Sequence, residues 1–258
     1  MEGLRDFLSR FAFRPEFDMF VGVERESLLV RDGAIVPIAP EVLAAFSENG
    51  RYGYELSACQ FEDRVGPVLI EGLLGALQEN EAEISAAEHA LGFSRSLYEV
   101  GPEDMPLDVY PDPTGRYQRI TKDMPRETLL AACRVIATHV HVGMPDHETA
   151  LMVYNGVRRR WRELGRMGDG SSGERLAIYT KMAPDFEPPN YPNWEEFYRA
   201  AVEKGFVSDP RKCWHFIRMS IHGTIEFRVF GATRDLGRVV TWARRCHDLC
   251  RAARDAAQ

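Results

Sequence analysis

The strongest constraint on the fold is a strand-like segment near the N-terminus that carries two acids on one of its faces. Residues 18–30 read DMFVGVERESLLV, and their alternation predicts a β-strand. Glu24 and Glu26 then point the same way, roughly 7 Å apart along the strand. Their neighbours on that face are apolar or glycine, so the segment must set two carboxylates beside a folded core.

Three later segments also place polar side chains on strands that are otherwise apolar. In two of them the polar residues are two positions apart, so they share one strand face. The pairs are Glu55 and Glu62 in residues 54–63, His139 and His141 in residues 135–144, and Glu226 and Arg228 in residues 217–230.

Free energy decides how such carboxylates can be accommodated. Each unpaired buried carboxylate costs several kcal/mol, and four or five of them would cancel a typical total stability of about 5–15 kcal/mol. They must therefore face water, pair with arginine or bind cations, and oxygen-rich ligand sets suit Mg²⁺ or Mn²⁺. The alternative is a half-solvated antiparallel sheet with polar residues on its open face.

Arginines supply the opposite charge. A guanidinium that faces a cluster of carboxylates and metal ions is typical of phosphate transfer, where it neutralises developing charge. Taken singly, each arginine also fits a surface ion pair, and Arg119 fits it best. The chain has no Walker A motif and no G-x-G-x-x-G, which argues against a P-loop or Rossmann nucleotide site. The candidates are Arg116 and Arg119 in GRYQR, Arg175 after the glycine-rich residues 165–173, and Arg218 and Arg228 in the last strand.

Composition narrows the choice of partners. The net charge of −7 argues against nucleic acid, and no apolar run approaches the roughly 20 residues that span a bilayer. Residues 1–14 lack the apolar stretch of a signal peptide, so we expect a cytoplasmic protein. The 5 cysteines include no C-x-x-C motif, which favours reduced, buried thiols. Cys246 and Cys250, with His247 between them, would need ligands from elsewhere to hold a metal.

Strand patterns alternate with helix patterns in no strict βαβ rhythm. This predicts an α+β fold with a mostly antiparallel sheet, in a single domain over residues 1–258. We expect the last strand to bend near His222 and Gly223, and residues 165–173 to form a mobile loop. The predicted helices cover residues 1–14, 67–91, 125–134, 147–164, 194–204 and 235–257, and irregular stretches cover residues 103–115 and 184–192.

Five short segments occur here in the order found in a known family. They are VGVERES, ELSACQFE, RYQR, THVHVG and GTIEFRV, and they run from about Phe20 to the final helix. On these motifs the chain resembles the glutamate–cysteine ligase type 2 family, also called the carboxylate–amine ligases. The resemblance implies a glutamine-synthetase-like catalytic fold, in which a curved antiparallel sheet forms a partial barrel with helices packed outside. It also implies ATP and Mg²⁺ at the inner face of that sheet.

The resemblance further implies roles for individual residues. Glu55 and Glu62 are seven positions apart, so they can join one site only if the strand contains a bulge or bend, which we expect near residues 57–59. The implied metal ligands are Glu24, Glu26, Glu55, Glu62, His141 and Glu226; the implied nucleotide contacts are Arg116, Arg119, Arg228 and His139; and the implied catalytic arginines are Arg228, Arg175 and Arg218.

The chain also departs from the family pattern. Phe216 in WHFIRMS and Gly231 in EFRVFGA stand where members tend to have Asp. The chain is short for the family and ends soon after the helix that begins at Asp235, so we expect a shortened member. Its metal and ATP half matches the pattern, whereas its acceptor half is altered.

These observations give one leading hypothesis and three alternatives. The leading one is an ATP- and Mg²⁺-dependent ligase, with Mn²⁺ as a substitute ion, that joins a small-molecule carboxylate to an amine through an acyl phosphate. The alternatives are a phosphotransferase on the same scaffold, a metal-dependent hydrolase centred on His139 and His141, and a non-catalytic nucleotide binder. A homodimer is the expectation from the general frequency of such assemblies.

Overall fold

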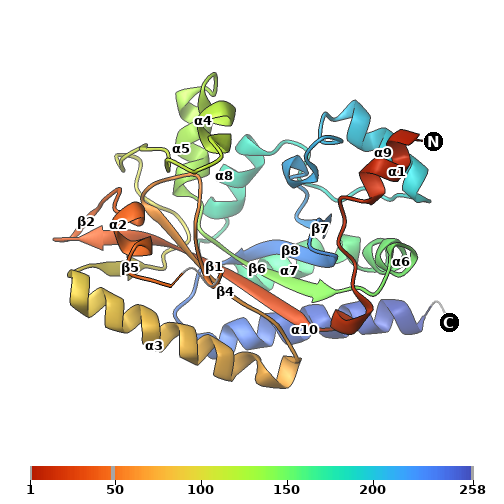
Figure 1. Ribbon diagram of the computed structural model, residues 1–258, viewed down its shortest axis with the longest axis horizontal. Helices are drawn as coiled ribbons and strands as arrows, with labels where there is room; N and C mark the ends of the chain where they lie inside the picture. The colour runs from red at the N-terminus through yellow and green to blue at the C-terminus, as the bar shows by residue number, and fades with distance from the viewer. Residues whose placement is uncertain (1, 48–49, 257–258) are drawn as a thin grey trace.

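One antiparallel sheet forms the centre of the computed structural model, which describes residues 2–47 and 50–256 (Figure 1). Its main path runs β3-β4-β1-β6-β8-β7, and β2 and β5 pair with the end of β1. The sheet is curved and open, so the predicted α+β fold with a mostly antiparallel partial barrel is confirmed. The strands are β1 (Val21–Arg31), β2 (Ala34–Ile35), β3 (Tyr52–Tyr54), β4 (Gln60–Val68), β5 (Ser94–Ser96), β6 (Ala137–Gly143), β7 (Ile217–Ser220) and β8 (Thr224–Gly231).

Helices lie on both sides of this sheet. In Figure 1, α3 and α10 run beneath it, whereas α4, α5 and α8 stand above its other side. The lower pair contacts the sheet directly, α3 against β4 and α10 against β6. The helices are α1 (Glu2–Leu8), α2 (Ala39–Leu43), α3 (Leu73–Leu91), α4 (Arg116–Thr121), α5 (Arg126–Arg134), α6 (His147–Val157), α7 (Trp161–Gly168), α8 (Glu174–Met182), α9 (Trp194–Glu203) and α10 (Leu236–Asp255).

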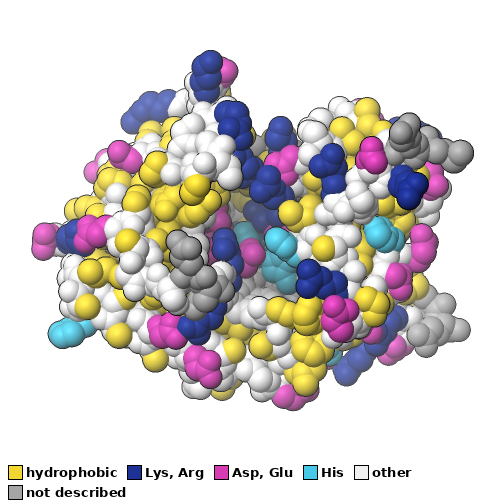
Figure 2. Space-filling model, viewed as in Figure 1, with side chains coloured by type: hydrophobic (Ala, Val, Ile, Leu, Met, Phe, Trp, Pro, Cys, Tyr) yellow, Lys and Arg dark blue, Asp and Glu magenta, His cyan; other side chains and the backbone are white. Residues whose placement is uncertain are grey.

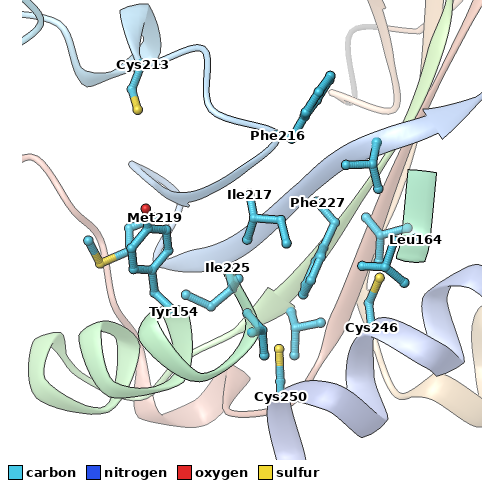
Figure 3. Close-up of a cluster of buried hydrophobic side chains, with 14 of the residues drawn as sticks. Tyr154, Leu164, Cys213, Phe216, Ile217, Met219, Ile225, Phe227, Cys246 and Cys250 are labelled. Atoms are coloured by element: carbon cyan, nitrogen blue, oxygen red, sulfur yellow. The ribbon is translucent and has the colours of Figure 1, made fainter. Parts of the chain in front are cut away.

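The main apolar core fills the space between the sheet and the helices α6 and α10. Figure 3 shows Ile217 and Phe227 of the β7–β8 hairpin facing Cys246 and Cys250 of α10. All four side chains are fully buried, and each such burial contributes about 1.5–3 kcal/mol. The two cysteines therefore fill the core, and their surroundings offer no metal site in the described part of the chain.

The predicted single strand over residues 54–63 is wrong. The chain reverses there, and β3 and β4 pair with each other as a hairpin. The backbone N–H of Cys59 donates to Ser57 Oγ at 3.1 Å and so helps to close the turn. The bend that Glu55 and Glu62 require thus lies where it was expected, but it is a full reversal, with Glu55 in the loop just after β3 and Glu62 on β4.

The predicted helix over residues 67–91 begins too early. Strand β4 continues to Val68 because it keeps pairing with β1, where Val21 lies opposite Val68. A 3₁₀ turn (Ile70–Gly72) follows, and α3 begins only at Leu73. Strand pairing therefore overrides the helical spacing of the sequence in this segment.

Residues 147–173 also differ from the prediction. The helix over residues 147–164 is divided into α6 and α7 by a 3₁₀ turn of three arginines (Arg158–Arg160). Helix α7 reaches Gly168, so only residues 169–173 form the loop. Asp169 accepts hydrogen bonds from the backbone N–H groups of Ser171 (3.1 Å) and Gly173 (2.6 Å), which gives the loop a defined, hydrogen-bonded turn.

The last predicted strand, residues 217–230, is a hairpin rather than one bent strand. Strands β7 and β8 pair with each other, and the chain reverses at the predicted position, before Gly223. Gly223 has φ +73°, and a Cβ atom there would collide with the carbonyl oxygen of Ala12. Position 223 therefore requires glycine, both because of its positive φ and because a side chain has no room there.

The other predicted elements agree with the structure to within two residues at their described ends. They are the helices over residues 125–134, 194–204 and 235–257 and the strand over residues 135–144. Two elements differ by more: the strand predicted over residues 18–30 begins only at Val21, and the N-terminal helix ends at Leu8 rather than near residue 14. Met1 and Ala257 lie outside the described residues. None of the helices in the described ranges has the length and apolar character needed to cross a membrane.

Candidate active site

The alternation of strands β1, β6 and β8 gathers acids and histidines on one face of the sheet. Glu24 in β1 lies opposite His139 in β6, and His141 lies opposite Glu226 in β8. His139 Nδ1 is 3.3 Å from Glu24 Oε2, and His141 Nε2 is 3.5 Å from the same oxygen. Three neighbouring strands thus build the floor of the site from residues that the strand pattern places on one face.

The β3–β4 hairpin adds two further acids. Glu62 lies directly opposite Glu26 across the β1–β4 ladder, and Glu55 follows β3 in the loop. Ligand atoms then converge in three groups, each with all its atoms within 4.8 Å of one another. The groups are Glu24 with Glu62 and His139, Glu24 with His141 and Glu226, and Glu26 with Glu55 and Glu62.

Burial and mutual repulsion disfavour the charged form of three of these acids. Burial, together with the charge of Glu62, raises the pKa of Glu26 to about 8. Burial and the charge of Glu26 likewise raise the pKa of Glu55 to about 7. The pKa of Glu62 lies well above its usual value because of burial and the charges of Glu24 and Glu55.

The other two acids stay ionised because cations or hydrogen-bonding imidazole groups face them. Burial alone would raise the pKa of Glu24, but His141 and His139 hold it well below its usual value. Burial also opposes ionisation of Glu226, yet Arg218 and Arg228 keep its pKa below the usual range. The cluster therefore contains carboxylates that stay ionised beside carboxylates whose ionisation is disfavoured.

These residues fit divalent cations. The donors are mainly carboxylate oxygens with two imidazole groups, the set that Mg²⁺ and Mn²⁺ accept. The buried His141 Nε2 has no hydrogen-bond partner within the described part of the chain, although it lies 3.5 Å from Glu24 Oε2. A divalent cation between these groups would relieve the repulsion among the acids and satisfy this nitrogen.

Glu226 holds two arginines at the edge of the acid cluster. Arg218 donates to it twice, from Nε to Oε2 at 2.7 Å and from Nη2 to Oε1 at 3.0 Å. Arg228 Nη1 donates to Oε1 at 2.5 Å, and its guanidinium carbon lies 5.7 Å from the centre of the Trp214 ring. Arg116 lines the same cavity from α4. Arg218 and Arg228 therefore face the acids, whereas Arg116 lies in the same cavity with Asp209 as its ion-pair partner at 3.4 Å.

Two other predicted arginines lie outside this cavity. Arg119 is exposed, and its Nη1 donates to the carbonyl oxygen of Thr114 at 2.8 Å. Arg175 is fully buried and donates to the carbonyl oxygen of Val229. Neither side chain lines the cavity, so neither is placed to contact a ligand there.

The cavity also contains residues that the sequence did not single out. Arg64 pairs with Glu62 at 2.5 Å, and it follows Glu62 by two positions on the same strand face, so the alternation of β4 could have revealed it. Tyr117 and Tyr179 reach the cavity from α4 and α8. Nothing in the local sequence predicts that these two helices stand over the acids.

Two cavities meet at the acid cluster. One holds about 400 Å³ and the other about 560 Å³. Glu24, Arg64, His141 and His222 line both of them. Figure 2 shows the molecule hollowed near the middle of one face, with histidine in the hollow and basic side chains along its upper rim. Small molecules could thus reach Glu24 through either cavity.

Comparison with known proteins supports the family resemblance. No family model matches the chain. "Putative glutamate–cysteine ligase 2-3" of Rubrobacter xylanophilus is 27% identical over 96% of this chain and 72% of its own length. "Putative glutamate–cysteine ligase 2-1" of Nocardia farcinica is 30% identical over 86% of this chain and 62% of its own. The chain is a homologue of these proteins. Its resemblance to the glutamate–cysteine ligase type 2 family is thus confirmed, although the chain spans only about two thirds of such relatives.

A solved structure supports the fold independently. The crystal structure of a bifunctional glutathione synthetase from Pasteurella multocida superposes with a TM-score of 0.60 at 15% identity. The match covers 96% of this chain and 40% of that protein. At this level of identity the likeness concerns the fold alone.

The two departures from the family pattern have physical partners in the structure. Phe216 is buried and stacks on Tyr179, with the ring centres 4.6 Å apart. Gly231 lies against the carboxyl group of Glu99, which occupies the space that a side chain at position 231 would need. Neither position lines the cavity, so neither departure removes a group from the acid cluster.

Proposed function

We propose that this homologue of glutamate–cysteine ligases is an ATP- and Mg²⁺-dependent ligase that joins a carboxylate to an amine. The proposal is carried by one observation, the convergence of five glutamates and two histidines from four strands and one loop. An isolated group of acids would be destabilising, whereas a nucleotide site with divalent cations needs such a group.

The acids and His141 would hold Mg²⁺, which would supply positive charge to neutralise the phosphate oxygens of the nucleotide. The ligands that the family resemblance implies are Glu24, Glu26, Glu55, Glu62, His141 and Glu226. Their placement in three overlapping groups suits more than one ion. His139, between Glu24 and Glu26, would support the same ions or contact the nucleotide.

The reaction has two steps. An oxygen of the substrate carboxylate attacks the γ-phosphorus of ATP, which forms an acyl phosphate and releases ADP. The amine nitrogen then attacks the acyl carbon, phosphate leaves, an amide forms and the nitrogen loses a proton. The chain need only position the reactants and stabilise charge.

Arg228 and Arg218 would provide part of that charge stabilisation. Both are bonded to Glu226, so their guanidinium groups are held in place before any ligand arrives. Such preorganised cations lower the free energy of a transition state in which negative charge spreads over phosphoryl oxygens. Arg116 would contribute at the rim of the same cavity.

The two cavities support a reaction between separate molecules. In phosphoryl transfer the attacking and leaving oxygens lie roughly in line, so the acid and the nucleotide must approach the transferred group from opposite sides. Two cavities that share Glu24 and His141 offer separate places for the two molecules beside the same residues. A single blind pocket would suit this reaction less well.

The proposal is tested by ADP release. The protein is incubated with ATP, Mg²⁺ and pools of acids and amines, and we expect at least one pool to raise ADP release and to yield an amide. Glu26→Gln should abolish this turnover, whereas Glu195→Gln, at an exposed position on α9, should leave it unchanged. The ligase proposal fails if no pool raises ADP release above background. A stable phosphorylated product without an amide would favour the phosphotransferase instead.

A further inference from the structure

We propose that Glu99 and Arg175 form a buried positioning pair that aims Arg228 into the cavity. Arg175 is fully buried and Glu99 is 8% exposed, and neither lines the cavity. They lie behind β8, at the end of the strand that carries Arg228. The expected effect on turnover rests on the proposed function, whereas the expected effect on the position of Arg228 does not.

The backbone of β8 is irregular at Arg228. The register of β6 and β8 shifts between Thr138 and Val140, where Arg228 and Val229 together oppose the single residue His139. A bulge of this kind interrupts the ladder and turns the neighbouring side chain to a new direction. The direction of the Arg228 side chain therefore depends on whatever holds the bulge.

Arg175 holds the bulge from α8. Its Nη2 donates to the carbonyl oxygen of Val229, the residue beside Arg228. The same helix carries Tyr179, whose hydroxyl donates to the carbonyl oxygen of Trp214 at 2.8 Å. The Trp214 ring in turn lies under the Arg228 guanidinium. Helix α8 thus fixes both the backbone that carries Arg228 and the ring that its guanidinium contacts.

Glu99 in turn fixes Arg175. Its Oε2 lies 3.6 Å from Arg175 Nε, and its Oε1 accepts a hydrogen bond from the backbone N–H of Gly170 at 2.6 Å. Two glycines make room for this carboxylate. A Cβ atom at Gly170 would lie 2.9 Å from Glu99 Oε1, and one at Gly231 would overlap the carboxyl group. The carboxylate therefore has one fitted position between the loop and the end of β8.

The pair has unsatisfied polar atoms, which a purely structural contact would avoid. Arg175 Nε and Nη1 and Glu99 Oε2 are buried and have no hydrogen-bond partner among residues 2–47 and 50–256. Leaving such atoms unpaired in the interior is unfavourable, so their presence here needs an explanation other than stability. The residue whose position this arrangement fixes most directly is Arg228, because Arg175 donates its hydrogen bond to the carbonyl oxygen of the next residue, Val229.

Trp214 gives a readout that does not require turnover. We would measure its emission as the difference between each variant and the same variant with Trp214→Phe. Arg175→Met should shift this emission and raise its quenching by acrylamide at least twofold, because Arg228 leaves the ring. Arg95→Lys is the matched control, since Arg95 is also a buried, ion-paired arginine but lies on β5, and it should leave Trp214 unchanged.

Kinetics test the same pair in a second way. Arg175→Met should lower kcat about 10–100-fold, as expected when a catalytic group is displaced, with KM for ATP changed less than threefold. Arg175→Lys should retain more kcat than Arg175→Met, and Gly231→Ala should resemble Arg175→Met because its methyl group displaces Glu99.

The outcomes separate this inference from the proposed function. If the wild-type protein has no ligase activity, the proposed function fails while the Trp214 measurement still decides the inference. If the Arg175 variants do not fold, Gly231→Ala decides it. The inference is overturned if folded variants at positions 175 and 231 keep the wild-type Trp214 emission, or if Arg95→Lys alters that emission to the same extent.

Discussion

At the scale of single residues, Glu226 illustrates how one buried carboxylate can organise two cations. Its two oxygens accept three hydrogen bonds from Arg218 and Arg228. Since the carboxylate is buried and almost fully engaged, its guanidinium partners keep fixed positions beside the cavity. Both arginines retain further N–H groups that a phosphate could accept from.

Replacing Arg228 tests its role in charge stabilisation. Arg228→Met should lower kcat by about 10²–10³-fold, the usual loss when one preorganised donor is removed from a developing anion. Arg119→Met is the control, because Arg119 is exposed and bonded only to the carbonyl oxygen of Thr114 among the contacts described for it. Steady-state ADP release measures both, and equal losses in the two variants would contradict the assigned roles.

The raised pKa of Glu26 predicts a pH dependence of stability. Its folded-state pKa of about 8 exceeds the ordinary 4.5, so its stabilising contribution is complete below pH 4.5 and is lost as the pH rises through 8. Buried His139 and His215, whose pKa values are lowered to about 4, oppose this loss only below pH 6.5, so the metal-free protein should lose thermal stability between pH 6.5 and 8. The lowered pKa values of Glu24 and Glu226 change the stability only below pH 4.5, so they do not oppose the loss of stability at higher pH.

Mg²⁺ should reverse this loss, because it binds the ionised acids. We expect 10 mM Mg²⁺, about the order of magnitude at which a weak site fills, to raise the melting temperature more at pH 8 than at pH 5. Differential scanning fluorimetry of the protein and of Glu26→Gln measures this. A larger Mg²⁺ effect at pH 5, or an unchanged profile in Glu26→Gln, would contradict the electrostatic account.

At the scale of elements, the β3–β4 hairpin is what brings Glu55 to the site. Gln60 ties this hairpin to the segment between α5 and β6. Its Nε2 lies within hydrogen-bond distance of the carbonyl oxygens of Cys133 (3.2 Å) and Val135 (3.3 Å), and its Oε1 accepts from the backbone N–H of Ser57. One buried amide thereby fixes the turn relative to the floor of the cavity.

Removing this amide should destabilise the protein. Gln60→Leu leaves buried backbone groups without partners, each of which costs about 1–3 kcal/mol, so we expect a loss of about 2–4 kcal/mol in the free energy of unfolding. Gln118→Leu is the matched control, because its amide bonds a single carbonyl at an exposed site and should change stability by less than about 0.5 kcal/mol. Urea denaturation measures both. Equal effects would show that Gln60 does not anchor the hairpin.

The part of the site that follows strand periodicity could be predicted from the sequence. Two-residue spacing alone places Glu24 with Glu26, and His139 with His141, on common strand faces. In the structure each pair lies on one face of its strand. Register between strands is a tertiary property, and so is the path of a turn. For that reason the pairing of Glu26 with Glu62 and the reversal after Glu55 depended on the resemblance rather than on spacing.

Helix placement was the least predictable feature. Arg119 lies in the RYQR motif and Arg175 follows the glycine-rich residues 165–173, yet Arg175 is buried next to β8 and Arg119 is exposed. The difference arises from how α4 and α8 stand on the sheet, which no local pattern encodes. The same reason hid Tyr117 and Tyr179, whose helices reach the cavity through packing alone.

At the scale of the whole molecule, the sheet separates two charged regions. The acid cluster occupies one face, and a buried ion-pair network occupies the other, where it joins the sheet to α3. There Arg25 Nη2 lies 3.0 Å from both Asp63 Oδ1 and Glu81 Oε2, and Arg95 Nη2 lies 2.6 Å from Glu81 Oε1. This network holds the outer helical layer against the strands that carry Glu24 and Glu26.

Breaking the network should destabilise the whole fold. Arg25→Met leaves Asp63 buried without its main partner, which typically costs about 3–5 kcal/mol in the free energy of unfolding. Arg199→Met, which removes an exposed partner of Glu196, should cost less than about 1 kcal/mol. Urea denaturation compares the two. A small loss in Arg25→Met would show that the layer is held by apolar packing alone.

The account as a whole depends on acids from distant segments holding divalent ions beside a nucleotide. The most direct measurement is anomalous diffraction from crystals grown with Mn²⁺ and a non-hydrolysable ATP analogue. We predict manganese peaks within about 2.0–2.3 Å of carboxylate oxygens of Glu24, Glu26 and Glu226, with the phosphates of the analogue beside Arg228. A nucleotide bound elsewhere, or a map without manganese among these acids, would contradict the account.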